Sequence, residues 1–278
     1  MTVKMALINN VINDDDFKLF VKLMYDSAGI FINQTKKNLV SNRLRKRIAE
    51  LNLSSYNQYY NYCLKNADEK IQCIEALTTN ETYFYREPKH WEFLIDKIIP
   101  EKIESDKNKI TKHFKVWSCA SSTGEEPYTL ALILKEFLPD CEKWKINILA
   151  TDINEKVLAA AQNGVYSYKR IDKLSPVWIS KYFVKNGDNY RIKDEIKKMV
   201  QFKKFNLFTD TNKEKYDLIL CRNVLIYFDE NSKTKVIKTI KNSLNSNSYF
   251  FLGHSEGIVN MDKELKFIQP SVYKLVQE

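Results

Sequence analysis

The sequence predicts a doubly wound α/β fold that is preceded by a small all-helical domain. Residues 14–78 carry apolar side chains at helical spacing, whereas from Ile110 onward short β-branched runs alternate with helical patterns. Such alternation is typical of a mostly parallel sheet whose strands are joined by helices. A third observation, the insertion at 166–198 with a hairpin-like Asn186-Gly187-Asp188 turn, predicts a small β-subdomain.

The amino-terminal domain is expected to comprise residues 1–80. Its first helix is indicated by Phe17, Phe20 and Met24, which follow each other at helical spacing. Three acidic residues, 14–16, precede them and suit the positive end of a helix dipole. A second amphipathic helix is indicated by Val40, Leu44, Ile48 and Leu51.

The second domain, 81–278, is expected to contain the sheet, and a helical stretch at 91–103 leads into it. We expect strands at 114–118, 146–151, 199–205, 216–221 and 249–252. We expect helices at 126–137, 155–162 and 232–244, and a closing β-hairpin from 267–268 and 272–276.

Composition predicts a cytoplasmic protein without disulfides or a metal site. Apolar residues make up 44% of the chain, which is enough for a core. No run reaches the roughly 18 apolar residues of a spanning helix, and Met1–Asn10 lacks the apolar stretch of a secretory signal. The five cysteines are odd in number and form no CxxC pair or histidine cluster.

The net charge of +9 is compatible with nucleic acid, an acidic membrane surface or an acidic protein as partner. A solvated, lysine-rich surface would give the same balance. Charge alone therefore does not identify the partner.

A ligand site is predicted where the first strand runs into residues 119–127. Small residues and Gly124 let a ligand approach the backbone at the carboxyl end of a strand. The loop lacks the glycine pattern of a dinucleotide site and the Gly-Lys-Ser/Thr of a P-loop. It carries Glu125 and Glu126 instead, which would repel a pyrophosphate and attract an ammonium or a sulfonium.

Three further strand ends add polar groups at the same edge. Asp152 ends the second strand, where nucleotide-binding sheets accept hydrogen bonds from ribose hydroxyls, although a surface turn is the plain alternative. Asn154 is expected to cap the next helix, which should stop at Gly164. Asn206 could bind an adenine edge. Arg222 and Asn223 follow the fourth strand, and Asn223 could equally be a turn cap.

In five segments the chain resembles the chemotaxis receptor methyltransferases, commonly called CheR. The resemblance spans nearly the whole length and is carried by 79–86 (TNETYFYR), 121–128 (SSTGEEPY), 150–153 (ATDI), 221–228 (CRNVLIYF) and 253–256 (GHSE). It implies a class I methyltransferase sheet, an S-adenosylmethionine cofactor and methyl transfer to glutamate side chains of chemoreceptors. Tyr85 and Glu81 depart mildly from the family pattern, and neither change removes a functional group.

By matching motif positions, the resemblance implies a set of cofactor contacts and leaves open which of the tandem acids takes part. The contacts would be Asn80, Thr82, Arg86, Glu126 (or Glu125), Asp152, Asn206, Leu207, Arg222 and Asn223. The implied partner is the cytoplasmic helical region of a chemoreceptor, met by a monomer that binds no nucleic acid and does not insert into the membrane.

Catalysis is predicted to depend on positioning, because a glutamate is already ionised at neutral pH and its methylation needs no general base. We expect Arg86 and Tyr227 to hold the substrate carboxylate. A structural salt bridge is the alternative for Arg86, and a packed aromatic is the alternative for Tyr227. The histidines, His90, His113 and His254, are assigned no chemistry.

Receptor binding is assigned to a basic segment. Residues 36–47 hold six basic side chains and no acid, and Arg43 and Arg47 lie one helical turn apart. These charges are expected to steer an acidic receptor region toward the enzyme; a solvated face is the alternative. In the resembling family the β-subdomain at 166–198 can also dock a receptor's carboxyl-terminal peptide, which this sequence leaves open.

Three rival functions would also fit a basic α/β chain of this kind. A nucleic-acid amino methyltransferase would need a motif such as Asn/Asp-Pro-Pro-Tyr after the fourth strand, where this chain has Arg222-Asn-Val-Leu225. A non-catalytic scaffold and a small-molecule carboxyl methyltransferase are the others.

Overall fold

The described residues, 11–258 and 262–276 of a computed structural model, divide into two units. One unit comprises the chain up to Thr79 together with Tyr227–Lys233, and the other comprises Asn80–Ile226 and the chain from Thr234 onward. The sequence does not predict that Tyr227–Lys233 joins the helical unit. Met1–Asn10, where no secretory signal is predicted, lies outside the described residues.

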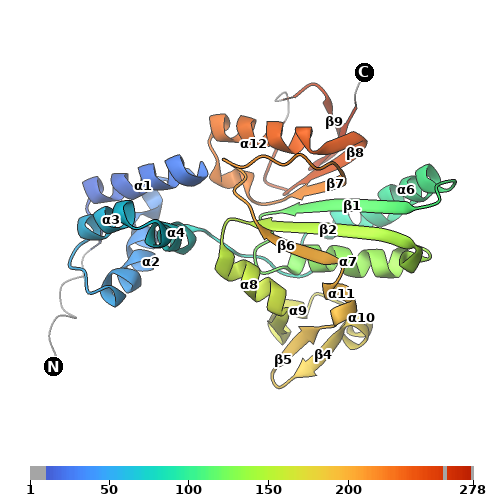
Figure 1. The fold of residues 1–278 in the computed structure, drawn as a ribbon, viewed down its shortest axis with the longest axis horizontal. Coiled ribbons are helices and arrows are strands. Elements are labelled where there is room, and N and C mark those ends of the chain that lie inside the picture. Colours follow the sequence, from blue (N-terminus) through green and yellow to red (C-terminus); the bar gives the residue numbers. More distant parts are fainter. Residues whose placement is uncertain (1–10, 259–261, 277–278) are drawn as a thin grey trace. The chain divides into compact units, whose positions relative to one another are not determined.

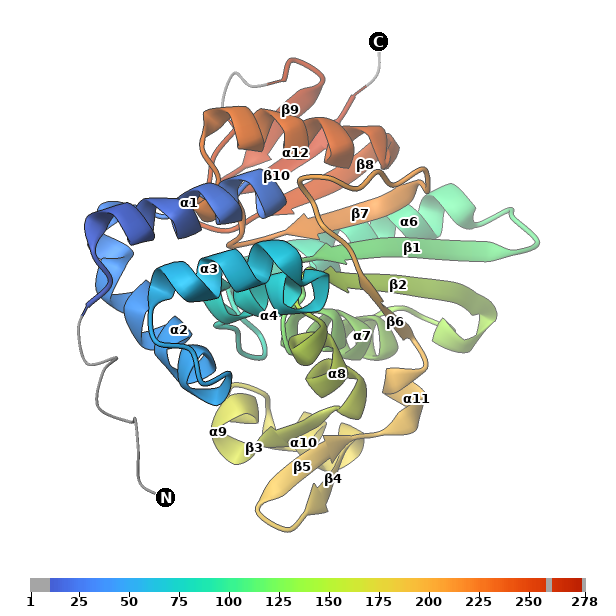
Figure 2. The ribbon, with the colours of Figure 1, turned by 60° about the vertical axis from the view of Figure 1, so that its left-hand side comes forward.

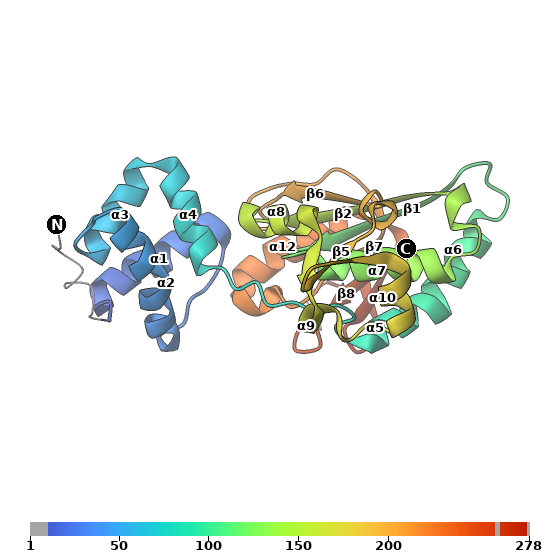
Figure 3. The ribbon, with the colours of Figure 1, turned by 90° about the horizontal axis from the view of Figure 1, so that it is seen from below.

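The first unit is helical, as predicted. It contains α1 (Asp14–Ala28), η1 (Gln34–Lys36), α2 (Lys37–Glu50), α3 (Tyr56–Lys65) and α4 (Ala67–Leu77), which form one group in Figures 2 and 3. The side chain of Asn13 caps α1 by accepting the Asp16 N–H at 2.8 Å. Phe17, Phe20 and Val40 are buried in the core of the unit, at the positions that the helical spacing indicates.

The second unit is built on a seven-stranded sheet of order β6-β2-β1-β7-β8-β10-β9 (Figure 1). Five strands are parallel, and β10 and β9 are antiparallel. Their bounds are β1 (Lys112–Cys119), β2 (Trp144–Asp152), β6 (Val200–Lys204), β7 (Tyr216–Cys221), β8 (Leu244–Leu252), β9 (Leu265–Gln269) and β10 (Val272–Leu275). The predicted doubly wound sheet and its closing hairpin are confirmed.

The helices of this unit precede or connect the strands. They are α5 (Pro88–Phe93), the π-helix η2 (Leu94–Ile98), α6 (Ile99–Asp106), α7 (Glu125–Phe137), η3 (Cys141–Lys143) and α8 (Glu155–Asn163). Two more, η4 (Leu225–Tyr227) and α12 (Glu230–Asn242), belong to this unit except for Tyr227 and the first turn of α12, which belong to the helical unit. None of the helices described is both long and apolar enough to cross a lipid bilayer. All five cysteines are free and buried in this structure.

One boundary prediction is wrong. The helix expected at 232–244 ends at Asn242, and β8 begins at Leu244 instead of residue 249. The pairing of β7 with β8 is irregular between Tyr216 and Leu218, and Asn247 has a φ of +62°. This bulged start of the strand carries polar residues, so it lacks the β-branched signal by which strands are read.

The insertion forms a separate three-stranded sheet of order β3-β5-β4, as predicted, and lies at the lower end of the unit in Figure 1. It contains β3 (Val165–Ser167), α9 (Tyr168–Ile171), α10 (Pro176–Tyr182), β4 (Phe183–Asn186), β5 (Asn189–Ile192) and α11 (Asp194–Lys197). The β4–β5 hairpin closes with Asn186 paired to Asn189 and with Gly187 at a φ of +60°.

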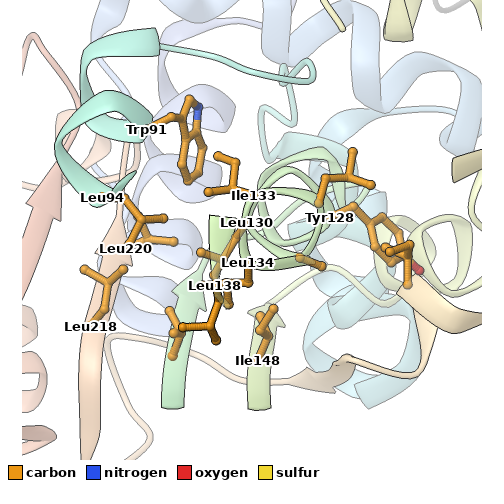
Figure 4. Close-up of a cluster of buried hydrophobic side chains, with 14 of the residues drawn as sticks. Trp91, Leu94, Tyr128, Leu130, Ile133, Leu134, Leu138, Ile148, Leu218 and Leu220 are labelled. Carbon is orange, nitrogen blue, oxygen red and sulfur yellow. The ribbon is translucent and has the colours of Figure 1, made fainter. Parts of the chain in front are cut away.

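The core beneath the site is apolar. Trp91 and Leu94 pack with Ile133 and Leu134 of α7 over the strand residue Leu220 (Figure 4). Because β1 lies between β2 and β7, the two halves of the sheet run outward from β1 in opposite directions. Ligands of open α/β sheets bind at such a switch point, beyond the carboxyl ends of the strands.

Candidate functional site

The loop after β1 follows a tight path that brings its backbone toward β2. Ser121 donates its N–H to the Thr151 carbonyl at 2.8 Å, and Ser122 donates its N–H to Oδ2 of Asp152 at 2.9 Å. Gly124 has a φ of +93°, and a Cβ at this position would lie 2.9 Å from the Cβ of Ala161. A glycine is therefore required both by the backbone angle and by the close approach of α8.

Asp152 lies at the end of β2, where its carboxylate is fixed from two sides. Its Oδ2 accepts from Ser122, and its Oδ1 accepts the Asn154 N–H at 2.9 Å. Asn154 in turn caps α8 by accepting the N–H groups of Lys156 and Val157. The helix ends at Gly164, whose φ is +64°, so both predicted caps of α8 are confirmed.

The tandem acids have different surroundings. Glu125 is fully buried, forms an ion pair with Arg170 and accepts the Thr123 hydroxyl at 2.7 Å. Glu126 accepts the Ser118 hydroxyl at 2.7 Å and pairs with Arg222 at 3.0 Å. Burial raises the pKa of both carboxyls, although their cationic partners act against this. Of the two, Glu126 is the one that contacts other residues of the predicted site.

Arg222 is buried and contacts two other segments of the predicted site. Its guanidinium is 1% exposed and lies between two carboxylates, Glu126 at 3.0 Å and Glu87 at 3.2 Å. It also donates to the carbonyl of Arg86 at 2.5 Å and lies 5.1 Å from the ring centre of Trp91. These contacts join β7 to the segment of 79–87 and to the start of α7.

Glu87 lies at the centre of a second group that sequence reasoning missed. Its carboxylate lies 3.3 Å from Nδ1 of His90 and 3.9 Å from Nε2 of His254. Burial would raise the pKa of Glu87, but Arg222, Asn223 and His254 together lower it below the usual value. One carboxylate oxygen of Glu87 and one ring nitrogen each of His90 and His254 lie within 4.8 Å of one another, an arrangement that could hold a metal ion. Arg222 already binds the same carboxylate oxygen, and the expectation of no metal stays a prediction.

The remaining cofactor candidates also lie in the second unit, and each of them contacts different residues. Arg86 donates to the carbonyl of Glu81 at 3.1 Å, and its guanidinium lies 5.7 Å from the ring centre of Tyr83. The carbonyl of Asn80 accepts the hydroxyl of Ser122 at 2.8 Å. Asn206 and Leu207 follow β6, and the side chain of Asn206 accepts the Phe208 N–H at 3.0 Å. Thr82 lies in the same 79–86 segment and is partly exposed.

A cleft of about 550 Å³ is lined by Lys89, Phe93, His254 and Ser271, among others. The predicted cofactor contacts do not include any of its lining residues. The assignment of the site therefore rests on the polar contacts at the strand ends.

The other three predicted residues belong to the helical unit. The carbonyl of Tyr227 accepts the N–H of Phe31 at 2.8 Å. Arg43 donates to the carbonyls of Leu77 and Thr78, at 2.9 and 2.7 Å. Arg47 donates to both carboxylate oxygens of Glu69, at 2.8 and 2.6 Å. Both arginines thus stabilise the fold of their own unit, which the helical spacing alone does not reveal.

Comparison with known proteins matches each unit to a domain of one family. The model of the CheR methyltransferase SAM-binding domain matches residues 80–274, and that of the CheR methyltransferase all-alpha domain matches residues 15–78. The chain belongs to the CheR methyltransferase family. The predicted resemblance, fold class and enzyme class are thereby confirmed, and the protein is an S-adenosylmethionine-dependent methyltransferase of chemotaxis.

Relatives match over nearly the full length of this CheR family member. It is 37% identical to a chemotaxis protein methyltransferase of Borreliella burgdorferi over 96% of both chains. It is 31% identical to that of Escherichia coli, over 100% of this chain and 95% of the other. Among solved structures, the glycopeptide N-methyltransferase MtfA complexed with S-adenosylmethionine aligns with a TM-score of 0.34 and 12% identity, covering 63% of this chain and 58% of that one.

The buried histidine predicts a pH dependence of stability. Burial, reinforced by the charge of Arg222, lowers the pKa of His90 from 6.5 to about 3. The unfolded chain binds this proton below pH 6.5 and the folded chain does not. The free energy of unfolding should therefore fall by up to about 1.4 kcal/mol per pH unit as the pH drops below that value.

The measurement is denaturant unfolding at pH 7.5 and 5.5 for wild type and His90→Phe, a change that keeps an aromatic ring to stack on Phe251. The variant should lose less stability at the lower pH than wild type. His113→Gln is the control and should lose as much stability as wild type. Equal losses in wild type and His90→Phe would show that this histidine is not held neutral.

Proposed function

We propose that this enzyme transfers the methyl group of S-adenosylmethionine to glutamate carboxylates in the cytoplasmic helical region of chemoreceptors. The observation that carries the proposal is the buried Arg222 between Glu87 and Glu126, near the carboxyl end of β1. Two carboxylates against one guanidinium leave a negative balance that suits a ligand with an ammonium and a sulfonium. Its chemotaxis relatives support the same reaction. We assign the enzyme to the cytoplasm and expect it to act as a monomer.

The cofactor would lie across the strand ends. The carboxylate of Asp152 accepts the N–H groups of Ser122 and Asn154, and at the end of β2 it would also accept a ribose hydroxyl. Glu126 would face the ammonium, and Asn206 would bind the adenine edge. The other proposed contacts are Asn80, Thr82, Arg86, Leu207, Arg222 and Asn223.

Bound S-adenosylmethionine supplies a methyl group that is activated by its sulfonium. The protein has to align an already ionised carboxylate with it and exclude water, since no general base is needed. Arg86 can bind that carboxylate, because a guanidinium has five N–H donors and the Glu81 carbonyl takes one of them. Tyr227 would donate a further hydrogen bond to the same carboxylate.

We expect loss of these donors to slow methyl transfer. Arg86→Ala should lower kcat/KM by about 100-fold, the scale of a lost charged donor in a transition state. Arg86→Lys should recover only part of the rate, because lysine lacks the planar guanidinium that can donate two parallel hydrogen bonds to a carboxylate. Tyr227→Phe should lower kcat/KM by about tenfold, because it removes one hydrogen-bond donor.

The assay follows labelled methyl groups into a receptor cytoplasmic fragment, and the label must be released by base, as an ester is. Titration with S-adenosylhomocysteine separates lost binding from lost chemistry. Tyr168→Phe, which alters an exposed tyrosine of the insertion, is the control and should be active. Turnover close to wild type in both Arg86→Ala and Tyr227→Phe would remove these residues from the mechanism.

The basic segment of the helical unit is proposed to steer the receptor toward the enzyme. Arg43 and Arg47 are the proposed receptor contacts, and each also donates hydrogen bonds within its own unit. Reversing the charge of Arg47 would place it against buried Glu69 and so destabilise the unit. Lys36 and Lys46 are exposed members of the same segment, and the Lys46 side chain is 86% exposed.

Lys36→Glu combined with Lys46→Glu should raise the KM for the receptor fragment several-fold at low salt. Its KM should then depend less on salt than that of wild type, because screening acts on the removed attraction. Lys65→Glu, at the exposed end of α3, is the matched control. An unchanged KM and an unchanged salt dependence in the double variant would argue against steering.

A further inference from the structure

We propose that Glu87 and Glu256 are positioning residues that together fix the turn carrying Arg222 and Asn223. The inference rests on the proposed function in one respect, namely that Arg222 and Asn223 contact the cofactor. Both carboxylates lie outside the set of residues that motif matching assigns to the cofactor. Each of them binds the same turn, and each does so from a different part of the chain.

Glu256 binds the backbone of the turn. Its Oε2 accepts the N–H of Asn223 at 2.7 Å and that of Gly253 at 2.6 Å, and its Oε1 accepts the N–H of Ile226 at 3.2 Å. A carboxylate that accepts several main-chain N–H groups acts like a cap, because these groups have no strand or helix partner. Glu256 therefore ties the loop after β7 to the loop after β8.

Glu87 binds the side chains of the same turn. Its Oε1 accepts Nδ2 of Asn223 at 3.1 Å and the N–H of His254 at 3.3 Å. Its Oε2 pairs with Nη2 of Arg222 at 3.2 Å. The two acids thus divide the contacts between them: Glu256 fixes where the backbone of the turn lies, and Glu87 fixes where its functional groups point.

Backbone strain shows that the turn needs such support. Asn223 has a φ of +59° and Glu87 has a φ of +58°, both in the left-handed region that favours glycine. Residues in this region persist only where surrounding contacts determine their conformation. Asn223 and Glu87 each receive that support from the other, through the hydrogen bond between their side chains.

The two loops also approach each other too closely for any side chain at residue 253. A Cβ built on Gly253 would lie 2.3 Å from Nδ2 of Asn223 and 2.8 Å from its backbone nitrogen. Gly253, unlike Gly124, has no positive φ, so it is required by this contact alone. The Gly253–Glu256 segment is therefore shaped around Asn223.

Neither acid is expected to touch the reacting atoms. The carboxylate oxygens of Glu87 and Glu256 are engaged by protein donors, and the Glu87 side chain is 10% exposed. They would act through Arg222 and Asn223, by keeping these side chains in place before the cofactor binds. Such preorganisation raises affinity because less ordering remains to be done on binding.

The test is calorimetric titration of the full-length chain with S-adenosylhomocysteine. Glu87→Gln and Glu256→Gln should each raise the Kd by about tenfold, the scale of hydrogen bonds to a charged group. The double variant should show a smaller increase than the product of the two, because both act on one turn. Glu92→Gln, an exposed acid in the same helix as His90, is the matched control and should stay within twofold.

Two further readouts separate positioning from general destabilisation. Amide hydrogen exchange at 222–226 should become faster in both variants, while exchange in β1 and β2 stays as in wild type. Gly253→Ala, which removes no charge, should raise the Kd by crowding Asn223, and it provides the same test if a glutamine variant fails to fold.

Wild-type affinity in Glu87→Gln and Glu256→Gln would overturn the inference, and so would fully independent effects in the double variant. Failure of the proposed function has a different signature. The chain would then bind S-adenosylhomocysteine with the expected variant effects but would not methylate a receptor fragment.

Discussion

The buried guanidinium of Arg222 is the interaction on which the architecture of the site depends. A charge with 1% exposure is tolerated only when it is paired and hydrogen-bonded, and Arg222 meets this condition through Glu87, Glu126 and the carbonyl of Arg86. Glu126 lies at the start of α7, whereas Arg86 and Glu87 are neighbours in the segment before α5. The cost of burying one charge is thus offset by contacts that also bring the segments of the site together.

The sheet explains why the partners meet. Because β1 lies between β2 and β7, the residues that follow these three strands gather at one edge. Ser122 and Asp152 are joined there by a hydrogen bond of 2.9 Å, and Glu126 at the start of α7 reaches Arg222 after β7. The rigid strands fix the positions of the loops, and the polar contacts fix the side chains.

The sequence predicted what depends on local patterns. The strand at Tyr216–Cys221, the caps of α8 and the acid at Asp152 were all indicated by residues close to them. Glu87 and Glu256 were missed, because they bind residues 136 and 33 positions away, and no spacing rule reports such pairs. The only local signal was their place beside or within motifs that match the family. Arg47 shows the same limit, since its ion pair with Glu69 joins two helices.

The most direct test of the central claim is calorimetric titration of S-adenosylmethionine into wild type and Arg222→Met. The account predicts heat from one site in the wild type, and an affinity at least about tenfold weaker once the guanidinium that orders the two acids is lost. Absence of heat with both S-adenosylmethionine and its demethylated form would contradict it. An Arg222→Met variant that binds as tightly as wild type would do so as well.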